Sequence, residues 1–168
     1  SLVSNSSFFL PYLSGERTPH NDPHIRGSFH AIKTTTDATN MQYAVIEGVS
    51  FGILDGVNSI LKVNDNFEKI FMVGGGSRSS FWIELLSSLL NRNLSVCDQS
   101  EYGAALGVAR LAMHSDKSIQ NNNIIKEITT SKDYFPSSNK SDILMKRYQI
   151  WKDLYSTNKK IASNLISK

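Results

Sequence analysis

The sequence predicts an α/β domain with a mixed sheet, in which antiparallel N-terminal strands precede parallel βα units and helices pack on the sheet. Two short apolar segments on either side of a proline-containing loop predict the antiparallel pair. Apolar residues at helical spacing predict one long helix over residues 39–61. Strand and helix patterns then alternate twice between residues 69 and 112, and such short connections favour right-handed parallel crossovers.

Length and composition indicate one globular domain spanning residues 1–168. Of the 168 residues, 40% are apolar and 20% are charged, which is enough for a core of ordinary size. The net charge of +3 comes without a basic block, so neither nucleic acid nor a membrane is expected as a partner. No apolar run approaches the ~18 residues that span a bilayer. The lone cysteine, Cys97, excludes an internal disulfide and favours a reducing compartment, most simply the cytoplasm.

The first strand is expected over Phe8–Leu13, where Pro11 removes a backbone donor and places the segment at a sheet edge or a strand end. Residues 14–24 form a polar loop that contains two prolines. Four of its side chains follow no established metal-ligand spacing, which favours a solvated, internally hydrogen-bonded loop over a metal site: Glu16, His20, Asp22 and His24. The second strand is expected over Gly27–Ile32, with His30 as a packed side chain outside any site.

The long helix carries two stripes. One is apolar, recurs at spacings of four and three and predicts the helix itself: Met41, Val45, Val49, Ile53, Val57 and Ile60. The other keeps a strict spacing of four and is made of small residues: Ala44, Gly48, Gly52 and Gly56. Glycine destabilises a helix interior by roughly 0.5–1 kcal/mol, so this stripe predicts tight packing on the sheet, or else a surface against a second domain or a nucleotide. Glu47 and Asp55 are interpreted as solvated charges.

A glycine-rich turn follows the next strand. Lys69–Val73 is an apolar segment of strand length, residues 74–79 are Gly-Gly-Gly-Ser-Arg-Ser, and a helix with a broad apolar face begins at once. Glycines let a phosphate or a base approach the backbone, and the free N–H groups of the following helix point at the ligand. The turn therefore predicts a nucleotide site, while a tight crossover between strand and helix is the alternative.

The helix after this turn has Ser79 or Ser80 as its expected N-cap and closes at residues 91–93, because asparagine tolerates the left-handed conformation. A short strand is expected over Leu94–Cys97. Residues 98–100 then cap a helix over 101–112 that is rich in small residues. Two helices with small faces thus flank the turn, so backbone is expected to approach backbone there.

The last third of the chain is expected to contain a polar segment, mostly loop, over residues 115–139, and then one helix. That helix runs from Asp142 to Leu165, within a C-terminal helical segment placed at 140–168. Its apolar stripe has roughly heptad spacing: Leu144, Tyr148, Trp151, Tyr155, Ala162 and Leu165. The aromatic rings favour docking within the chain over a coiled-coil homodimer, which stays possible.

As a bare pattern, residues 74–79 also approach the G-x-G-x-x-G fingerprint of dinucleotide-binding enzymes, with serine in place of the third glycine. Asp98 follows the next strand at about the offset of a ribose-binding acid. That fingerprint should open on the first strand of its sheet, whereas here an antiparallel pair and a glycine-striped helix precede it. An NAD-type oxidoreductase domain is therefore the alternative interpretation.

Four motifs in order resemble the C-terminal domain of the FGGY carbohydrate kinases. Residues 9–23, FLPYLSGERTPHNDP, resemble the start of that domain in xylulose kinases. Residues 27–47 resemble the family's second signature, with Ala31 standing where glycine is usual. Residues 74–79 resemble its adenine-nucleotide turn, and Glu101 with residues 103–107 resembles the helix that follows. The likeness then thins to residues 133–136 and the last helix.

The resemblance implies an actin-like, ribonuclease-H-like ATPase domain, the second of two that close around sugar and ATP. Gly75, Gly76 and Ser77 would line the adenosine pocket, and Ser80 would approach the base. Gly74 and Arg78 would complete the turn. The implied reaction transfers the γ-phosphate of ATP to a sugar hydroxyl, most simply that of D-xylulose, to give xylulose 5-phosphate.

Its implied partners are ATP or ADP with Mg²⁺, a pentulose, and the chain's own N-terminal domain. That domain would supply the sugar-binding residues and the general base, so no catalytic residue is assigned here, and Mg²⁺ would be held mainly by ATP and the other domain. The chain begins at Ser1 without methionine and is expected to be a piece of a longer protein. Alone it should fold, bind adenine nucleotide weakly at best, and leave sugar unphosphorylated. A non-catalytic actin-like interaction module is a further alternative.

Overall fold

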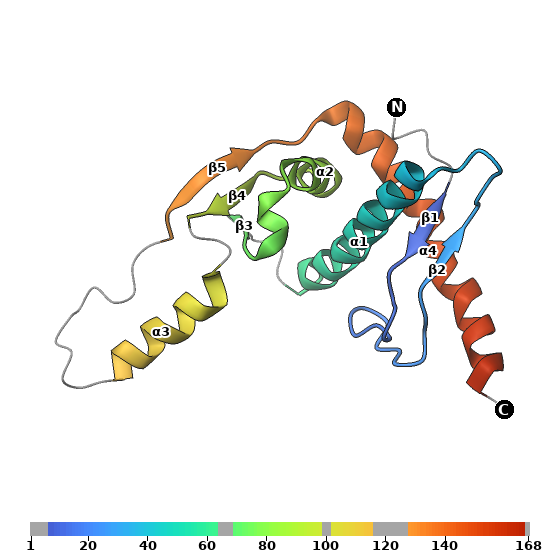
Figure 1. Cartoon of the computed structure of the whole chain (residues 1–168), viewed down its shortest axis with the longest axis horizontal. Helices are drawn as coiled ribbons and strands as arrows, with labels where there is room; N and C mark the ends of the chain where they lie inside the picture. The colour runs from blue at the N-terminus through green and yellow to red at the C-terminus, as the bar shows by residue number, and fades with distance from the viewer. Residues whose placement is uncertain (1–6, 64–68, 99–101, 116–127, 167–168) are drawn as a thin grey trace.

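The computed structural model describes residues 7–63, 69–98, 102–115 and 128–166, and Figure 1 shows their arrangement. Its elements follow the predicted order of two strands, a long helix, two strand–helix units and a C-terminal helix. One strand, β5, is added to that order. The strands and helices are β1 (Phe8–Leu10), β2 (Ser28–His30), α1 (Ala38–Leu61), β3 (Ile70–Met72), α2 (Ser80–Leu90), β4 (Leu94–Cys97), α3 (Gly103–Ser115), β5 (Thr130–Tyr134) and α4 (Ser138–Ile166).

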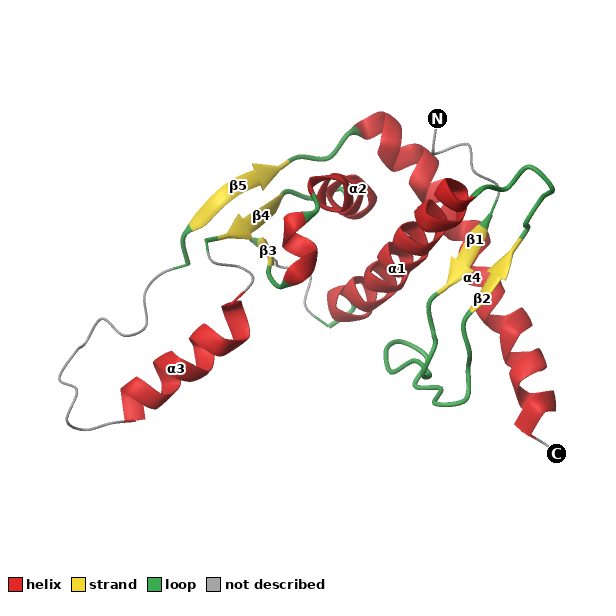
Figure 2. Ribbon diagram, in the orientation of Figure 1, coloured by secondary structure: helices red, strands yellow, loops and turns green. Residues whose placement is uncertain are grey.

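The strands form two sheets, where the sequence predicted one mixed sheet (Figure 2). As predicted, β1 and β2 pair antiparallel, with Phe9 opposite Phe29, and β3 and β4 pair parallel. The second sheet is mixed because β5 pairs antiparallel with the free edge of β4. The β5 segment was predicted to be loop. Its residues are polar and only Tyr134 is buried, so backbone pairing, which leaves no apolar pattern, makes this strand.

Helix α1 lies at the centre of the larger core. Asp37 caps its N-terminus by accepting a hydrogen bond from the Asn40 N–H at 2.7 Å. Of the small-residue stripe, Gly48 is required by packing, because an added Cβ would lie 2.1 Å from the Phe9 carbonyl oxygen of β1. At Gly52 the nearest atom would be 3.7 Å away, and at Gly56 nothing lies within 4 Å. Tight packing on the sheet is thus confirmed at one glycine of the three.

Two acidic residues of α1 that were predicted to be solvated are buried instead. Glu47 is 0% and Asp55 is 9% exposed. Both are paired across the core with side chains of α4: Arg147 binds Glu47, and the Tyr148 hydroxyl donates to Asp55. The prediction was wrong because it considered α1 alone, whereas α4 supplies the partners that make burial of these charges possible.

Helix α4 docks on its own chain, as its aromatic stripe predicted. Leu144, Tyr148 and Trp151 join the core formed by β1, α1 and α2, and the Trp151 Nε1–H donates to the Phe9 carbonyl oxygen at 2.8 Å. The helix begins at Ser138, four residues before the predicted start, and the side chain of Leu165 lies outside the described residues. Packing against β1, α1 and α2 of the same chain, rather than against a second copy, therefore buries this face of α4.

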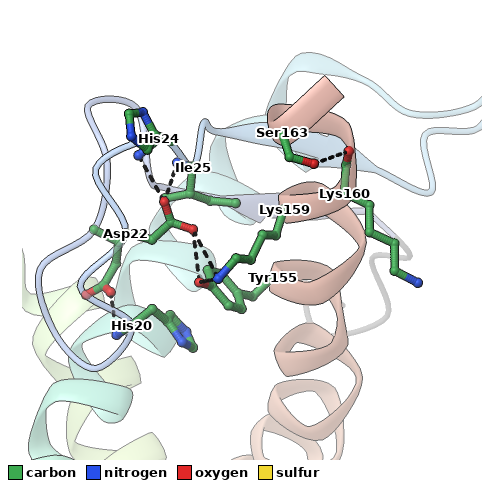
Figure 3. Close-up of polar contacts among 9 residues, drawn as sticks. His20, Asp22, His24, Ile25, Tyr155, Lys159, Lys160 and Ser163 are labelled. Carbon is green, nitrogen blue, oxygen red and sulfur yellow. Dashed lines mark hydrogen bonds and ion pairs between the residues drawn. The ribbon is translucent and has the colours of Figure 1, made fainter. Parts of the chain in front are cut away.

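The loop between β1 and β2 has internal hydrogen bonds, as expected, and is also anchored to α4 (Figure 3). The Glu16 carboxylate accepts the backbone N–H groups of Thr18 and His20. Asp22 accepts the N–H groups of His24 and Ile25 through one carboxylate oxygen. Its other oxygen accepts a hydrogen bond from the Tyr155 hydroxyl of α4 at 3.0 Å.

Helix α3 lies apart from the other helices, and none of its described residues is buried (Figure 1). The expected close approach of its backbone is not found: an added Cβ at Gly103 would be 3.8 Å from Val73, and one at Gly107 would meet nothing within 4 Å. Of the predicted cap, Asp98 is described, while residues 99–101 lie outside the described residues.

Helix α1 is long and apolar enough to cross a bilayer by length and composition alone, with a hydropathy of 1.4 in its 18-residue window. The sequence was not expected to contain such a segment. Core helices meet the same criterion, and α1 carries buried Glu47 and Asp55 and packs on β1, α2 and α4. These contacts account for the buried 33% of that window.

Candidate nucleotide-binding site

The glycine-rich turn is a sharp bend between β3 and α2. Gly74 has φ +82° and ψ −174°, a conformation that L side chains rarely adopt, so glycine is required there. Gly75–Arg78 form a single 3₁₀ turn, in which the Ser77 hydroxyl donates to the Gly74 carbonyl oxygen at 2.7 Å. Ser79, one of the two predicted N-caps, accepts the Trp82 N–H at 3.3 Å and begins α2.

One side of this bend is open and the other is filled. An added Cβ at Gly74 or Gly75 would meet nothing within 4 Å. An added Cβ at Gly76 would lie 2.6 Å from the Trp82 ring, so this glycine gives the indole room. Packing within the described residues therefore explains Gly76 but leaves the side-chain space at Gly75 unused.

The filled side ties the bend to α1. The Trp82 Nε1–H donates to the Ser50 Oγ at 2.9 Å, and the Ser50 hydroxyl donates in turn to the Ile46 carbonyl oxygen at 2.7 Å. Ser50 is fully buried, so water does not compete for these two hydrogen bonds. Trp82 thus forms a fixed floor beneath Gly76.

The N-terminal end of α2 is held from a second direction by β5. The Tyr134 hydroxyl donates to the Ser80 Oγ at 2.9 Å, and the Lys132 ammonium lies 4.5 Å from the centre of the Tyr134 ring. Sequence reasoning missed both Trp82 and Tyr134 as supports of the bend. Trp82 carried a faint signal, an indole one turn after the glycines, whereas Tyr134 carried none because its strand was not predicted.

All six residues assigned to nucleotide binding lie on this one bend. Gly75, Arg78 and Ser80 are exposed, Gly74 and Gly76 are half-buried, and Ser77 is buried beneath the turn. Asp98, the acid of the dinucleotide alternative, is exposed at the end of β4. Glu101 lies outside the described residues.

Metal ligands do not gather in the described part of the chain. There, no group of three or more histidine, cysteine, aspartate or glutamate side chains could hold a metal ion. The carboxylates of Glu16 and Asp22 in the β1–β2 loop instead accept hydrogen bonds from backbone N–H groups, and Asp22 also accepts one from the Tyr155 hydroxyl of α4. What the bend offers chemically is accessible backbone and hydroxyl groups at a helix N-terminus, which suits a polar, anionic ligand.

Comparison with known proteins assigns this fold to one family. Residues 2–115 match the model of the FGGY family of carbohydrate kinases, C-terminal domain. The xylulose kinase of Escherichia coli is 30% identical over 151 residues, which cover 88% of this chain and 31% of that protein. The chain spans about a third of the length of the curated relatives it matches.

Solved structures agree. A xyloylose kinase from Brucella ovis superposes with a TM-score of 0.78 at 34% identity, covering 90% of this chain and 31% of that one. A gluconate kinase from Lactobacillus acidophilus gives a TM-score of 0.71 at 27% identity, with the same shares of the two chains. The mixed α/β fold is thus that of the C-terminal, actin-like ATPase domains of these kinases. This chain belongs to the FGGY family of carbohydrate kinases, whose C-terminal domain it contains.

Proposed function

We propose that this chain is the nucleotide-binding half of a sugar kinase that transfers the γ-phosphate of ATP to a sugar hydroxyl. Carbohydrate kinases of the FGGY family use ATP. The observation that carries the proposal is the open bend at Gly74 and Gly75, where an added Cβ would meet nothing within 4 Å. A helix N-terminus follows this bend directly, and exposed backbone N–H groups beside a helix N-terminus are suited to phosphate and ribose oxygens.

Each residue of the bend has a proposed role in this site. The adenosine pocket is lined by Gly75, Gly76 and Ser77. Ser80 approaches the base, and Gly74 and Arg78 complete the turn. The Mg²⁺ that neutralises charge during phosphoryl transfer is held mainly by ATP itself and by a second domain.

That second domain is the proposed partner of this chain. In-line phosphoryl transfer needs a sugar hydroxyl placed against the γ-phosphate, which two closing domains achieve together. We therefore assign the sugar-binding residues and the general base to an N-terminal domain, and treat residues 1–168 as one C-terminal domain. By itself the chain should bind adenine nucleotide weakly at best and should not phosphorylate sugar.

The favoured substrate is D-xylulose, which would be converted to xylulose 5-phosphate. The support is that the relatives reported above include xylulose kinases at 30–34% identity. A gluconate kinase is also similar, at 27% identity, so the sugar has to be measured. The family match favours a kinase over the dinucleotide-binding alternative, because residues 74–79 lie inside the matched region.

The nucleotide site is tested by calorimetry on the chain with ATP, ADP and NAD⁺. The expected result is weak binding of ATP and ADP but not of NAD⁺, and loss of that binding in Gly75→Val, whose side chain occupies the open space without a clash in the fold. Thr157→Val, which places a valine on exposed α4, is the matched control and should bind as the wild type does. Equal ATP affinity in both variants would place the nucleotide elsewhere.

The reaction is tested by measuring ADP release from the whole protein that contains this chain, with D-xylulose, D-gluconate and glycerol offered separately. Release with D-xylulose above the other two supports the assignment. A preference for another sugar keeps the kinase and replaces its substrate. Sugar-dependent ATP turnover by residues 1–168 alone would contradict the division of labour between two domains.

A further inference from the structure

The N-terminal residue of α2 does not stand alone at the proposed site. Ser80 is exposed, and its hydroxyl is bound by the Tyr134 hydroxyl of β5 at 2.9 Å, although 54 residues separate the two in the chain. Ser80 is also the residue to which the proposed function gives the contact with the base. A side chain from another strand therefore sets the position of a group assigned to the ligand.

Tyr134 is itself held firmly. It is 7% exposed, and its ring packs in the smaller core with Ile83, Leu86 and Leu94. Its carbonyl oxygen accepts the buried Ser87 hydroxyl at 3.3 Å, so its backbone is tied to α2 as well. The Lys132 ammonium covers the outer face of the ring at 4.5 Å from its centre. The fixed ring holds its hydroxyl oxygen within hydrogen-bonding distance of the Ser80 hydroxyl.

We infer that Tyr134 is a positioning residue for nucleotide recognition, which orients the Ser80 hydroxyl toward the base. The inference rests on the proposed function, because it needs an adenine nucleotide at the bend. A serine hydroxyl has one proton and two lone pairs. With one lone pair occupied by the Tyr134 proton, the proton of Ser80 is left to be donated outward, to a hydrogen-bond acceptor. Adenine presents ring nitrogens that are acceptors.

Tyr134 lies in a part of the chain that the family model does not match. The match ends at residue 115, whereas Tyr134 lies on β5, which adds to the edge of β4. The strand thus does more than extend the sheet: it brings a hydroxyl to the first turn of α2. We expect base selectivity in this protein to depend on β5 as well as on the glycine-rich bend.

A double-mutant cycle on ATP affinity tests this inference. Tyr134→Phe keeps the ring in its core and removes only the hydroxyl, and Ser80→Ala removes its acceptor. One hydrogen bond is worth enough that each change should weaken ATP binding by roughly three- to ten-fold. Because Tyr134 acts through Ser80, Tyr134→Phe should cost nothing more once Ser80 is alanine. The ratio of ATP to GTP affinity should fall in each single variant.

Tyr148→Phe is the matched control, since it removes another hydroxyl within the core, one that donates to Asp55. It should lower thermal stability and leave the ATP affinity of the folded protein unchanged. If destabilisation alone weakened ATP binding, Tyr148→Phe would weaken it too. Additive losses in the double variant, or wild-type ATP affinity in Tyr134→Phe, overturn the inference and leave the proposed function intact. If the whole wild-type protein that contains this chain binds no ATP, both the inference and the proposed function are overturned.

Discussion

Arg147 of α4 grips Glu47 of α1 across the core: its Nε and Nη2 each lie 2.6 Å from one of the two carboxylate oxygens. The Glu47 side chain is 1% and the Arg147 side chain 12% exposed. Arg147 also donates to the Ser7 carbonyl oxygen at 3.1 Å and lies 4.4 Å from the centre of the Phe8 ring. Burial raises the pKa of Glu47, and the guanidinium opposes that shift.

Removing one partner of this pair should be costly, because the other charge is left buried alone. Arg147→Met is expected to lower the free energy of unfolding by about 3–5 kcal/mol, measured by urea denaturation. The double variant Glu47→Gln with Arg147→Met should recover a large part of the loss. If Arg147→Met alone unfolds at the wild-type urea concentration, the pair has no role in stability.

Two alanine substitutions in the glycine stripe of α1 should have opposite effects on stability. Gly48→Ala drives a methyl group against the Phe9 carbonyl oxygen and should destabilise the fold by about 1–3 kcal/mol or more. Gly56→Ala meets no neighbour and should stabilise it by about 0.5–1 kcal/mol, because alanine is the better helix former. Thermal unfolding of both variants checks the difference, and equal melting temperatures would contradict it.

Ala31 occupies the left-handed region with φ +55°, a conformation that favours glycine. A Cβ in that conformation is strained by roughly 1–2 kcal/mol, so Ala31→Gly should stabilise the protein, by about 1 kcal/mol after the entropy that glycine adds to the unfolded chain. The control is Ala112→Gly on the exposed surface of α3, which should destabilise by about 1 kcal/mol. Denaturation curves that move in the same direction would refute the explanation.

Asp22 should make stability depend on pH in the acidic range. Its pKa is lowered, first by the His24 N–H and further by the Tyr155 hydroxyl at 3.0 Å, the Ile25 N–H and the Lys159 ammonium (Figure 3). Because the folded pKa lies below the unfolded value of about 3.9, the stabilisation is complete above that value and is lost as pH falls through the folded pKa.

The test compares thermal unfolding of the wild type and Asp22→Asn between pH 7 and about pH 2. The variant should be less stable at pH 7 and should lose less stability on acidification. Asp153→Asn, an exposed carboxylate on α4, is the control for general charge effects. If the stabilities of the wild type and Asp22→Asn change in parallel with pH, titration of Asp22 does not contribute to the pH dependence.

Features that depend on neighbouring residues could be predicted from the sequence. The Ser79 cap, the left-handed Asn91 at the end of α2 and the bend at Gly74 follow from the chemistry of a few adjacent side chains. The docking of α4 followed from aromatic rings at regular spacing. The motifs that resemble the FGGY family lie in these same local patterns.

What could not be predicted depends on partners far along the chain. Glu47 was predicted to be a solvated charge because its partner, Arg147, lies 100 residues further along the chain. The β5 strand is stabilised by pairing with β4, so its polar sequence carried no period. The supports of the candidate site, Ser50 behind Trp82 and Tyr134 behind Ser80, likewise join separate elements.

Helix α4 lies wholly beyond residue 115, where the family match stops, yet Leu144 and Trp151 are among the most deeply buried side chains of the core. The segment that matches the family model and the segment needed to complete the core therefore have different boundaries. A recombinant product trimmed to the matched residues would expose the apolar surfaces of β1 and α1 that α4 now covers, and would tend to aggregate.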